Sequence, residues 1–183
     1  MEPELLCGLL KARIGRVTKP RHRLTYTFAA LATLSLVLIL DQTSKWVAVA
    51  TLPPGEAVPV IGDWFRLYLV RNPGAAFSMG TDITPVLAMI QLAAVALCVF
   101  LAFRSRSWLS AVTMGLIGGG AAGNFIDRVF REPGGLHGHV VDFFSFWSFA
   151  IFNVADIAIT VGVALYLIYV FIVEPRTERK AQA

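Results

Sequence analysis

The residue pair that raises the question of chemistry lies in the stretch FNVADIAIT, at the head of an apolar run that continues to Val173. Asp156 stands inside this stretch without a basic neighbour in the sequence, and Asn153 precedes it by three positions, on the same face of a helix. A carboxylate at the centre of a membrane helix costs about +2.5 to +3.5 kcal/mol on insertion scales. Because an uncompensated cost of this size is rarely retained without a use, Asp156 is the first candidate functional residue.

Asp142, in the stretch VVDFF, is the candidate partner of Asp156. Two carboxyl groups that share a dry site do not both ionise easily, so one of them keeps its proton. The ionised member can act as a general base on a bound water, while the protonated member hydrogen-bonds the carbonyl under attack. This chemistry suits hydrolysis of a peptide bond with neither a metal nor a covalent intermediate. We expect the two groups to titrate as a unit.

Other chemistries have weaker support in the sequence. His137 and His139 could bind zinc together with an aspartate, but they lie in a glycine-rich loop without a third histidine and suit polar loop positions. Ser44 and Lys45 are adjacent on a predicted helix and therefore point in different directions, which disfavours a Ser–Lys dyad. We expect no metal and no cofactor. A small transporter or proton channel would also use intramembrane carboxylates, but it would need polar residues through the full membrane depth.

The elements that must position these residues are membrane helices. The chain has 183 residues, of which 56% are hydrophobic and 15% charged, with a mean hydropathy of +0.67. A spanning helix needs about 20 mostly apolar residues, and the charge-free runs that predict such helices are Leu24–Leu40, Ile83–Phe103, Ser107–Ile126 and Ile157–Val173. The last run can extend back through Phe149–Ala155. The first run could instead be a signal peptide cleaved near Ala48–Ala50, although further spans follow it.

The loop after the first run, about residues 50–82, predicts a small sheet on the outer surface. Val58–Ile61 and Trp64–Val70 are rich in β-branched and aromatic residues and are bounded by Gly and Pro, and Asn72-Pro73-Gly74 is a turn signal. The second outer loop, residues 130–148, is expected to rest its aromatic side chains at the membrane interface. The predicted fold class is an all-α integral membrane protein with four transmembrane helices and a β-rich extracytoplasmic cradle between the first two.

The distribution of Lys and Arg predicts the orientation. Basic residues gather in residues 1–23, in the turn at Arg104–Arg106 and in residues 176–183, all on one side of a four-span chain. By the positive-inside rule this side is cytoplasmic. We therefore expect a basic cytoplasmic leader (1–23), a single membrane domain (24–175) and a cytoplasmic tail (176–183). The net charge of +4 favours contact with anionic membrane lipids. No basic patch interleaves with aromatic residues, so no nucleic-acid partner is expected.

With this orientation, polar residues from several elements converge on the outer boundary of the membrane. Asp41 and Lys45, four apart, end the first helix, and Asn124, Asp127 and Arg128 share a face near the end of the third. Taken singly, such residues also suit helix caps and structural ion pairs, with Asp41–Lys45 and Asp127–Arg128 as the candidate pairs.

The third helix carries a stripe of small residues. Gly115, Gly119 and Gly123 recur every four residues, a spacing that lets helices in a membrane approach closely. The first interpretation is close packing within the bundle. The alternative is that the stripe leaves room for a substrate helix.

Five stretches, in order, resemble the lipoprotein signal peptidases (signal peptidase II), the intramembrane aspartic proteases of bacteria: DQTSKW, RNPGAAFS, GGGAAGNFIDRV, VVDFF and FNVADIAITVG. The resemblance covers about residues 36–165. It implies a catalytic dyad of Asp142 and Asp156. It also implies supporting roles for Asp41, Lys45, Asn72, Gly74, Asn124, Arg128, Val140 and Asn153. Asp127 belongs to a matching stretch too, and it is the nearest rival of Asp142 for the dyad.

The resemblance further implies the substrate and the location. The substrate would be a prolipoprotein whose cysteine already carries a diacylglyceryl group, cut just before that cysteine to release the signal peptide. The protein would be a multi-pass, monomeric protein of the bacterial cytoplasmic (inner) membrane, with both termini cytoplasmic and its active site at the extracytoplasmic leaflet boundary. The basic leader is longer than the family core needs, and the loop between Asp142 and Asp156 is compact.

Overall fold

The computed structural model describes residues 20–74 and 83–173. Most of the predicted leader, the predicted tail and the second half of the stretch RNPGAAFS lie outside the described residues. The helices are α2 (Pro20–Thr51), α3 (Thr84–Ala102), α4 (Trp108–Phe130) and α5 (Val154–Ile168), the last continued by a π-helical turn, η3 (Tyr169–Val173). Four helices in the described part are long and apolar enough to cross a membrane, which confirms the four predicted spans.

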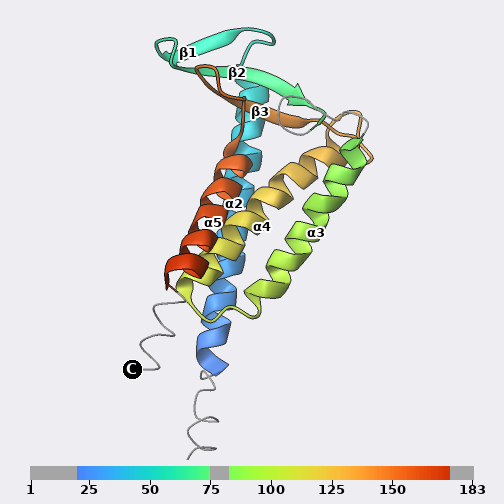
Figure 1. Ribbon diagram of the computed structural model, residues 1–183. Helices are drawn as coiled ribbons and strands as arrows, with labels where there is room; N and C mark the ends of the chain where they lie inside the picture. The colour runs from blue at the N-terminus through green and yellow to red at the C-terminus, as the bar shows by residue number, and fades with distance from the viewer. Residues whose placement is uncertain (1–19, 75–82, 174–183) are drawn as a thin grey trace, which may run out of the picture.

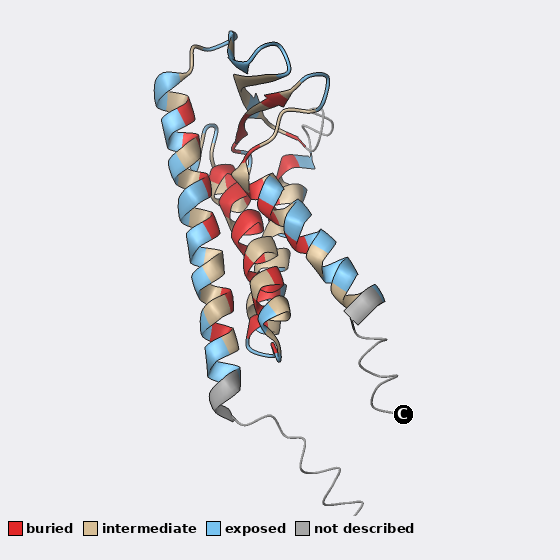
Figure 2. Cartoon of the chain, turned by 90° about the vertical axis from the view of Figure 1, so that its left-hand side faces the viewer, coloured by how far each residue is buried: buried red, intermediate tan, exposed pale blue. Residues whose placement is uncertain are grey.

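The bundle is arranged around α4. Figure 1 shows the sheet capping one end of the helices, while the turn between α3 and α4 lies at the other end. Figure 2 shows that buried residues concentrate along α4, whereas α2 exposes one whole side. The exposed apolar side chains of α2 and α3, such as Phe28, Ile39 and Met89, are those expected to face lipid.

The glycine stripe of α4 is a packing surface for α2. A Cβ at Gly115 would lie 2.6 Å from the Cβ of Thr33, and one at Gly119 would lie 2.7 Å from the carbonyl oxygen of Leu34. A Cβ at Gly123 would collide with the carboxylate of Asp41. The packing interpretation is therefore confirmed. The alternative, space for a substrate helix along this stripe, is wrong, because α2 already fills it.

The sheet has three antiparallel strands in the order β1 (Ala57–Ile61), β2 (Phe65–Asn72) and β3 (Val140–Phe146). The first two strands were predicted. The third was not predicted: it falls in the second loop, for which the sequence analysis expected only that aromatic side chains rest at the interface. The register places Asn72 opposite Val140 and Val70 opposite Asp142. The cradle is therefore built from both outer loops, and it joins a predicted site residue on β2 to one on β3.

The sheet is docked on the C-terminal end of α2 by apolar contacts. Val141 and Phe143 of β3 are buried together with Ala48 of α2, and Leu67 and Leu69 of β2 pack against this cluster. The alternation of β3 thus turns Val141 and Phe143 towards α2 and leaves Asp142 on the opposite face.

The start of α5 differs from the prediction. The helix does not extend back through Phe149, because Asn153 is its N-cap and adopts an extended backbone. The residue before the cap, Phe152, instead pairs with Phe144 of β3. Asp156 is consequently the third residue of α5, in the first turn, rather than a residue of the helix interior. It forms a capping box with Asn153, so local hydrogen bonds offset part of the free-energy cost of placing its carboxylate in a membrane helix.

Candidate active site

Asp142 is held on β3 by two side-chain amides from different elements. Its carboxyl group is 3% exposed. The Nδ2 of Asn72, at the end of β2, donates to Oδ2 at 3.0 Å, and the Nδ2 of Asn153 donates to Oδ1 at 2.6 Å. Because both amides come from elements that the sheet and the α5 cap fix, the carboxyl group has one defined orientation.

Asp156 is held by one backbone N–H group and one side-chain amide. Its Oδ2 accepts a hydrogen bond from the backbone N–H of Asn153 at 3.1 Å, and its Oδ1 accepts one from the Nδ2 of Asn124 at 3.0 Å. Asn153 therefore contacts both members of the predicted pair. The fold brings together the two carboxyl groups that the sequence analysis paired, although they belong to a strand and to a helix.

Burial raises the pKa of Asp142 above its ordinary value, to about 6. The negative charge of Asp156 acts in the same direction, whereas the hydrogen bonds from Asn72 and Asn153 and the positive charge of Lys45 oppose the shift. A carboxyl group with a pKa near 6 is protonated more readily than an ordinary aspartate, in roughly a tenth of the molecules at pH 7. A shift in this direction is the one expected of the member of a carboxylate pair that keeps its proton.

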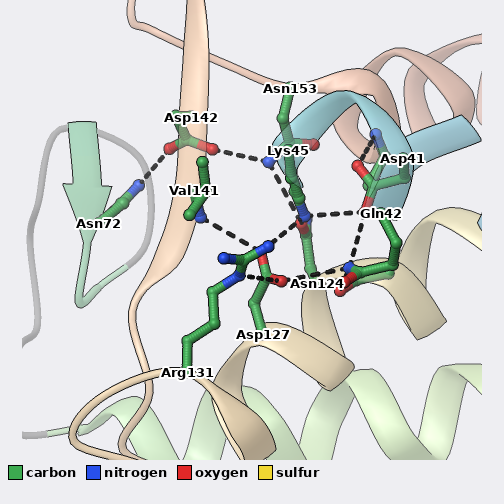
Figure 3. Close-up of polar contacts among 12 residues, drawn as sticks. Asp41, Gln42, Lys45, Asn72, Asn124, Asp127, Arg131, Val141, Asp142 and Asn153 are labelled. Atoms are coloured by element: carbon green, nitrogen blue, oxygen red, sulfur yellow. Dashed lines mark hydrogen bonds and ion pairs between the residues drawn. The ribbon is translucent and has the colours of Figure 1, made fainter. Parts of the chain in front are cut away.

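A buried ionic cluster lies directly behind the pair. The Nζ of Lys45 is 2.8 Å from Asp41 Oδ2, 2.8 Å from Asp127 Oδ2 and 2.8 Å from Asn124 Oδ1, and all three charged side chains are 0% exposed. The three donors of the ammonium group are thus all used. Figure 3 shows these contacts between α2 and α4. The predicted Asp41–Lys45 ion pair is confirmed.

Lys45 also determines which way the amide of Asn124 points. An ammonium group can only donate, so the oxygen of Asn124 must face Lys45 and its Nδ2 must face Asp156. The Nδ2 of Asn153 donates to the same oxygen at 3.2 Å. A chain of hydrogen bonds therefore connects the ionic cluster to both carboxyl groups of the pair.

Asp127 is fully occupied within the cluster. Besides Lys45, it accepts hydrogen bonds from Arg131 at 2.7 Å, from Gln42 at 3.1 Å and from the backbone N–H of Val141 at 3.2 Å. Asp127 thus anchors β3 one residue before Asp142. This arrangement favours a structural role for Asp127 over the rival assignment to the dyad.

Two members of this cluster were missed by the sequence analysis, Gln42 and Arg131. Arg131 follows Asp127 by four residues and adds a cation that balances the second carboxylate of the cluster. The i,i+4 spacing was a signal that could have identified it. Gln42 carried no such signal, because only the packing of α2 on α4 brings its amide to Asp127 and to the carbonyl oxygen of Gly123.

The predicted ion pair between Asp127 and Arg128 is wrong. Adjacent residues on a helix point about 100° apart, and Arg128 turns towards the sheet instead. Its Nη2 donates to the carbonyl oxygen of Gly74 at 2.8 Å, and Gly74 in turn donates its N–H to Asn72 Oδ1 at 3.1 Å. Arg128 is 4% exposed, yet its Nε and Nη1 have no hydrogen-bond partner among the described residues.

A cavity of about 500 Å³ opens beside the pair. Its walls come from α3, α4, α5, β3 and the segment before α5. The polar residues that line it are Asn72, Gln91, Asn124, Arg128, Asp142, Asp156 and Thr160. Gly74 and Val140 also line it, whereas Asp41, Lys45, Asp127 and Asn153 lie behind its wall. The predicted supporting residues therefore form two groups. Those of the first group line the cavity, and those of the second hydrogen-bond to the cavity residues, directly or through Lys45, and orient their side chains.

Asp41 connects α2 to α5 as well as to Lys45. Its Oδ1 accepts a hydrogen bond from the backbone N–H of Ala155 at 2.9 Å, one residue before Asp156.

The histidines considered for zinc lie in the loop after α4. The ring Nδ1 of His137 contacts the carbonyl oxygen of Gly135 within this loop. Across residues 20–74 and 83–173, no three His, Cys, Asp or Glu side chains are grouped so that they could hold a metal ion.

The structure defines the class of the protein as a multi-pass membrane protein with a buried carboxylate site. It has four membrane-spanning helices, a capping sheet and a pair of carboxyl groups at a cavity. Comparison with known proteins identifies the family. The family model described as "Signal peptidase (SPase) II" matches residues 33–172. The chain belongs to the signal peptidase II family, as the five sequence stretches predicted, and the transporter alternative is not favoured.

Individual relatives agree with this assignment. The chain is 46% identical over 150 residues to a lipoprotein signal peptidase of Mycobacterium avium, covering 82% of this chain and 81% of the relative. It is 43% identical over 165 residues to a lipoprotein signal peptidase of Rhodococcus jostii, covering 90% and 81%. A solved structure titled "Bacterial membrane enzyme structure by the in meso method at 1.9 A resolution" is similar with a TM-score of 0.67 and 29% identity, covering 78% of this chain and 92% of that one.

Proposed function

We propose that this chain is an intramembrane aspartic endopeptidase that removes signal peptides from prolipoproteins, with Asp142 and Asp156 as its catalytic dyad. The observation that carries the proposal is the position of Asn153. Its side chain donates to Asp142 and its backbone donates to Asp156, so one residue aligns both carboxyl groups at the wall of one cavity. The family indicates the reaction, and this geometry supports the choice of these two residues.

In the proposed mechanism the dyad divides acid and base roles. Asp156 is the ionised member and takes a proton from a water as the water oxygen attacks the carbonyl carbon of the peptide bond. Asp142, whose pKa is raised by burial, is the protonated member and donates its proton to the carbonyl oxygen. When the tetrahedral intermediate collapses, that proton returns to Asp142, the C–N bond breaks, and the leaving nitrogen receives the proton held by Asp156. Both groups then have their starting protonation states.

The remaining polar groups of the cavity suit binding of an extended peptide. The free Nε–H and Nη1–H of Arg128 are donors in a nearly dry site, and backbone carbonyl oxygens of a peptide are acceptors that need such partners. A peptide bond inside a helix is protected by its intrahelical hydrogen bond, so the cut site must be unwound. Arg128 would stabilise that unwound segment.

The proposed location is the bacterial cytoplasmic (inner) membrane, with both termini and the Arg104–Arg106 turn in the cytoplasm and the sheet outside. The basic residues 1–23 and 176–183 form a cytoplasmic leader and tail around a single membrane domain, residues 24–175, which acts as a monomer in contact with membrane lipids. The charge asymmetry between the two ends of the bundle supports this orientation.

A cysteine at the exposed position of Trp64 tests this orientation, in a background without Cys7 and Cys98. We expect an impermeant maleimide to label it in intact spheroplasts, because β1, β2 and the dyad share the outer side. A cysteine at Arg106 should react only after lysis. The reverse pattern would place the carboxylates on the cytoplasmic side and contradict the proposed site of cleavage.

The proposed substrate carries a diacylglyceryl group on the cysteine after the cut. Each buried methylene adds about 0.8 kcal/mol of membrane affinity, so two acyl chains hold the adjacent peptide bond at the depth of the interface. Fixed depth supplies effective concentration and orientation for attack by the dyad's water.

We therefore expect a precursor with an unmodified cysteine to be cut at least about tenfold more slowly than its lipidated counterpart, a barrier difference of about 1.4 kcal/mol. The measurement is kcat/KM for the matched pair in one detergent or bilayer. Equal values would remove the lipid from the recognition step, even if the dyad were intact.

A further inference from the structure

The side of α3 that faces the cavity carries one partly buried amide with no assigned role. Gln91 stands in an otherwise apolar stretch of the helix, and its neighbour Met89 is exposed and does not line the cavity. Gln91 itself lines the cavity together with Asn124 and Asp156. Neither the five matching stretches nor the ionic cluster includes it.

The Oε1 of Gln91 is buried and has no hydrogen-bond partner among the described residues. A buried acceptor without a donor costs free energy in water-soluble proteins, and more so in hydrocarbon, where water cannot supply the missing bond. Leu or Met at this position would avoid that cost. An unpaired acceptor on a residue that lines a cavity is therefore explained if rotation of its amide brings the oxygen to a donor of the occupant.

The position of Gln91 indicates which part of an occupant it meets. Thr160, which lines the same cavity, follows Asp156 by one helical turn on α5. Since α5 runs from the sheet towards the opposite end of the bundle (Figure 1), the cavity extends inward from the dyad. In the proposed orientation the signal peptide has its N-terminus in the cytoplasm, so its residues before the cut occupy this inner part.

We propose that Gln91 is a substrate-binding residue whose Oε1 accepts a hydrogen bond from a backbone N–H of the signal peptide, on the N-terminal side of the cut. This inference rests on the proposed function. Unwinding the peptide near the cut frees backbone N–H groups that have no partner in lipid. Gln91 provides an acceptor for one of them, as Arg128 provides donors for the carbonyl oxygens. Recognition of the backbone rather than of a side chain suits an enzyme that processes precursors of different sequence.

The test is a double-mutant cycle between enzyme and substrate. The enzyme variant is Gln91→Met, which keeps the unbranched shape and removes the acceptor, with Gln91→Leu as a second variant. Met89→Leu, at an exposed position on the same helix, is the matched control. The substrates are lipidated precursor peptides in which a backbone ester replaces the amide at the first, second or third residue before the cut, which removes one N–H at a time.

With the all-amide precursor, we expect kcat/KM of Gln91→Met to be about tenfold below wild type, as for loss of one buried hydrogen bond. Met89→Leu should stay within twofold. With wild type, one of the three esters should be cut about tenfold more slowly, whereas Gln91→Met should cut that ester and the all-amide precursor at rates within twofold of each other. Unfolding midpoints in detergent should show that both Gln91 variants are folded.

Equal penalties for each ester in wild type and Gln91→Met would overturn the proposal, as would wild-type turnover by both Gln91 variants. In that case replacement of an unpaired amide should only raise the unfolding midpoint. Failure of the underlying function has a different signature, because normal cleavage of the all-amide precursor by Asp142→Asn would refute the dyad whatever the Gln91 result.

Discussion

Asp142→Asn and Asp156→Asn should each abolish cleavage of a lipidated precursor while the protein stays folded. Each change removes an acid–base function but keeps the size of the side chain and an oxygen that can accept a hydrogen bond. General acid–base catalysis contributes typically 10²- to 10⁴-fold, so we expect kcat/KM to fall by at least about 10³-fold. The double variant should be little worse than either single one, because residues that act as a unit are not additive.

The matched control for the dyad is Asp63→Asn, which removes a carboxylate from an exposed position in the turn between β1 and β2. It should keep wild-type activity. Activity of the wild type should also survive a chelator, since the proposed mechanism uses no metal. Normal turnover in Asp142→Asn together with an inactive but folded Asp127→Asn would move the dyad to the rival residue. Loss of activity with EDTA and recovery with zinc would replace the mechanism altogether.

Lys45→Met should cause the largest loss of stability. It leaves the carboxylates of Asp41 and Asp127, both 0% exposed, without their shared cation. Removing one partner of a buried ion pair typically costs about 3–5 kcal/mol, because an uncompensated charge stays buried. We expect a decrease of this size in the free energy of unfolding, measured by equilibrium unfolding in mixed micelles. Activity should be lost as well, since the amide of Asn124 is no longer oriented by an ammonium group.

The double variant Asp41→Asn/Lys45→Met separates charge balance from orientation. It removes one anion with the cation, and the asparagine oxygen can still accept the N–H of Ala155. Stability should therefore recover by more than half of the loss, because Asp127 keeps its contact with Arg131 at 2.7 Å. Activity should not recover, because the oxygen of Asn124 then keeps only the hydrogen bond from Asn153 and no longer faces an ammonium group. A folded Lys45→Met with wild-type kcat/KM would show that Lys45 neither stabilises the bundle nor positions the dyad.

The sequence alone determined the membrane helices and the family. Spans of about 20 apolar residues have few physical alternatives, because every backbone polar group in lipid must be satisfied within the helix. Asp156 was identified for a related reason, because a charged side chain in such an apolar run raises the free energy of inserting the helix into the membrane. The i,i+4 spacing of Asp41 and Lys45 was sufficient to predict their ion pair, because a helix fixes the geometry of neighbours at that distance.

Contacts between distant segments were decided only by the tertiary structure. β3 forms because β2, some 70 residues earlier, offers it a hydrogen-bonding edge. VVDFFSF is rich in β-branched and aromatic residues, as β1 and β2 are, but its pairing with β2 could not be predicted from local sequence. The direction of Arg128, the contact of Gln42 with Asp127 and the unpaired oxygen of Gln91 likewise depend on how α2, α3 and the sheet pack around α4. The sequence by itself predicted which polar residues gather at one end of the helix bundle. Which of them face the cavity, and which hold the others in place, was decided by packing, because a side chain's partners across the bundle depend on helix rotation and strand register rather than on its neighbours in the chain.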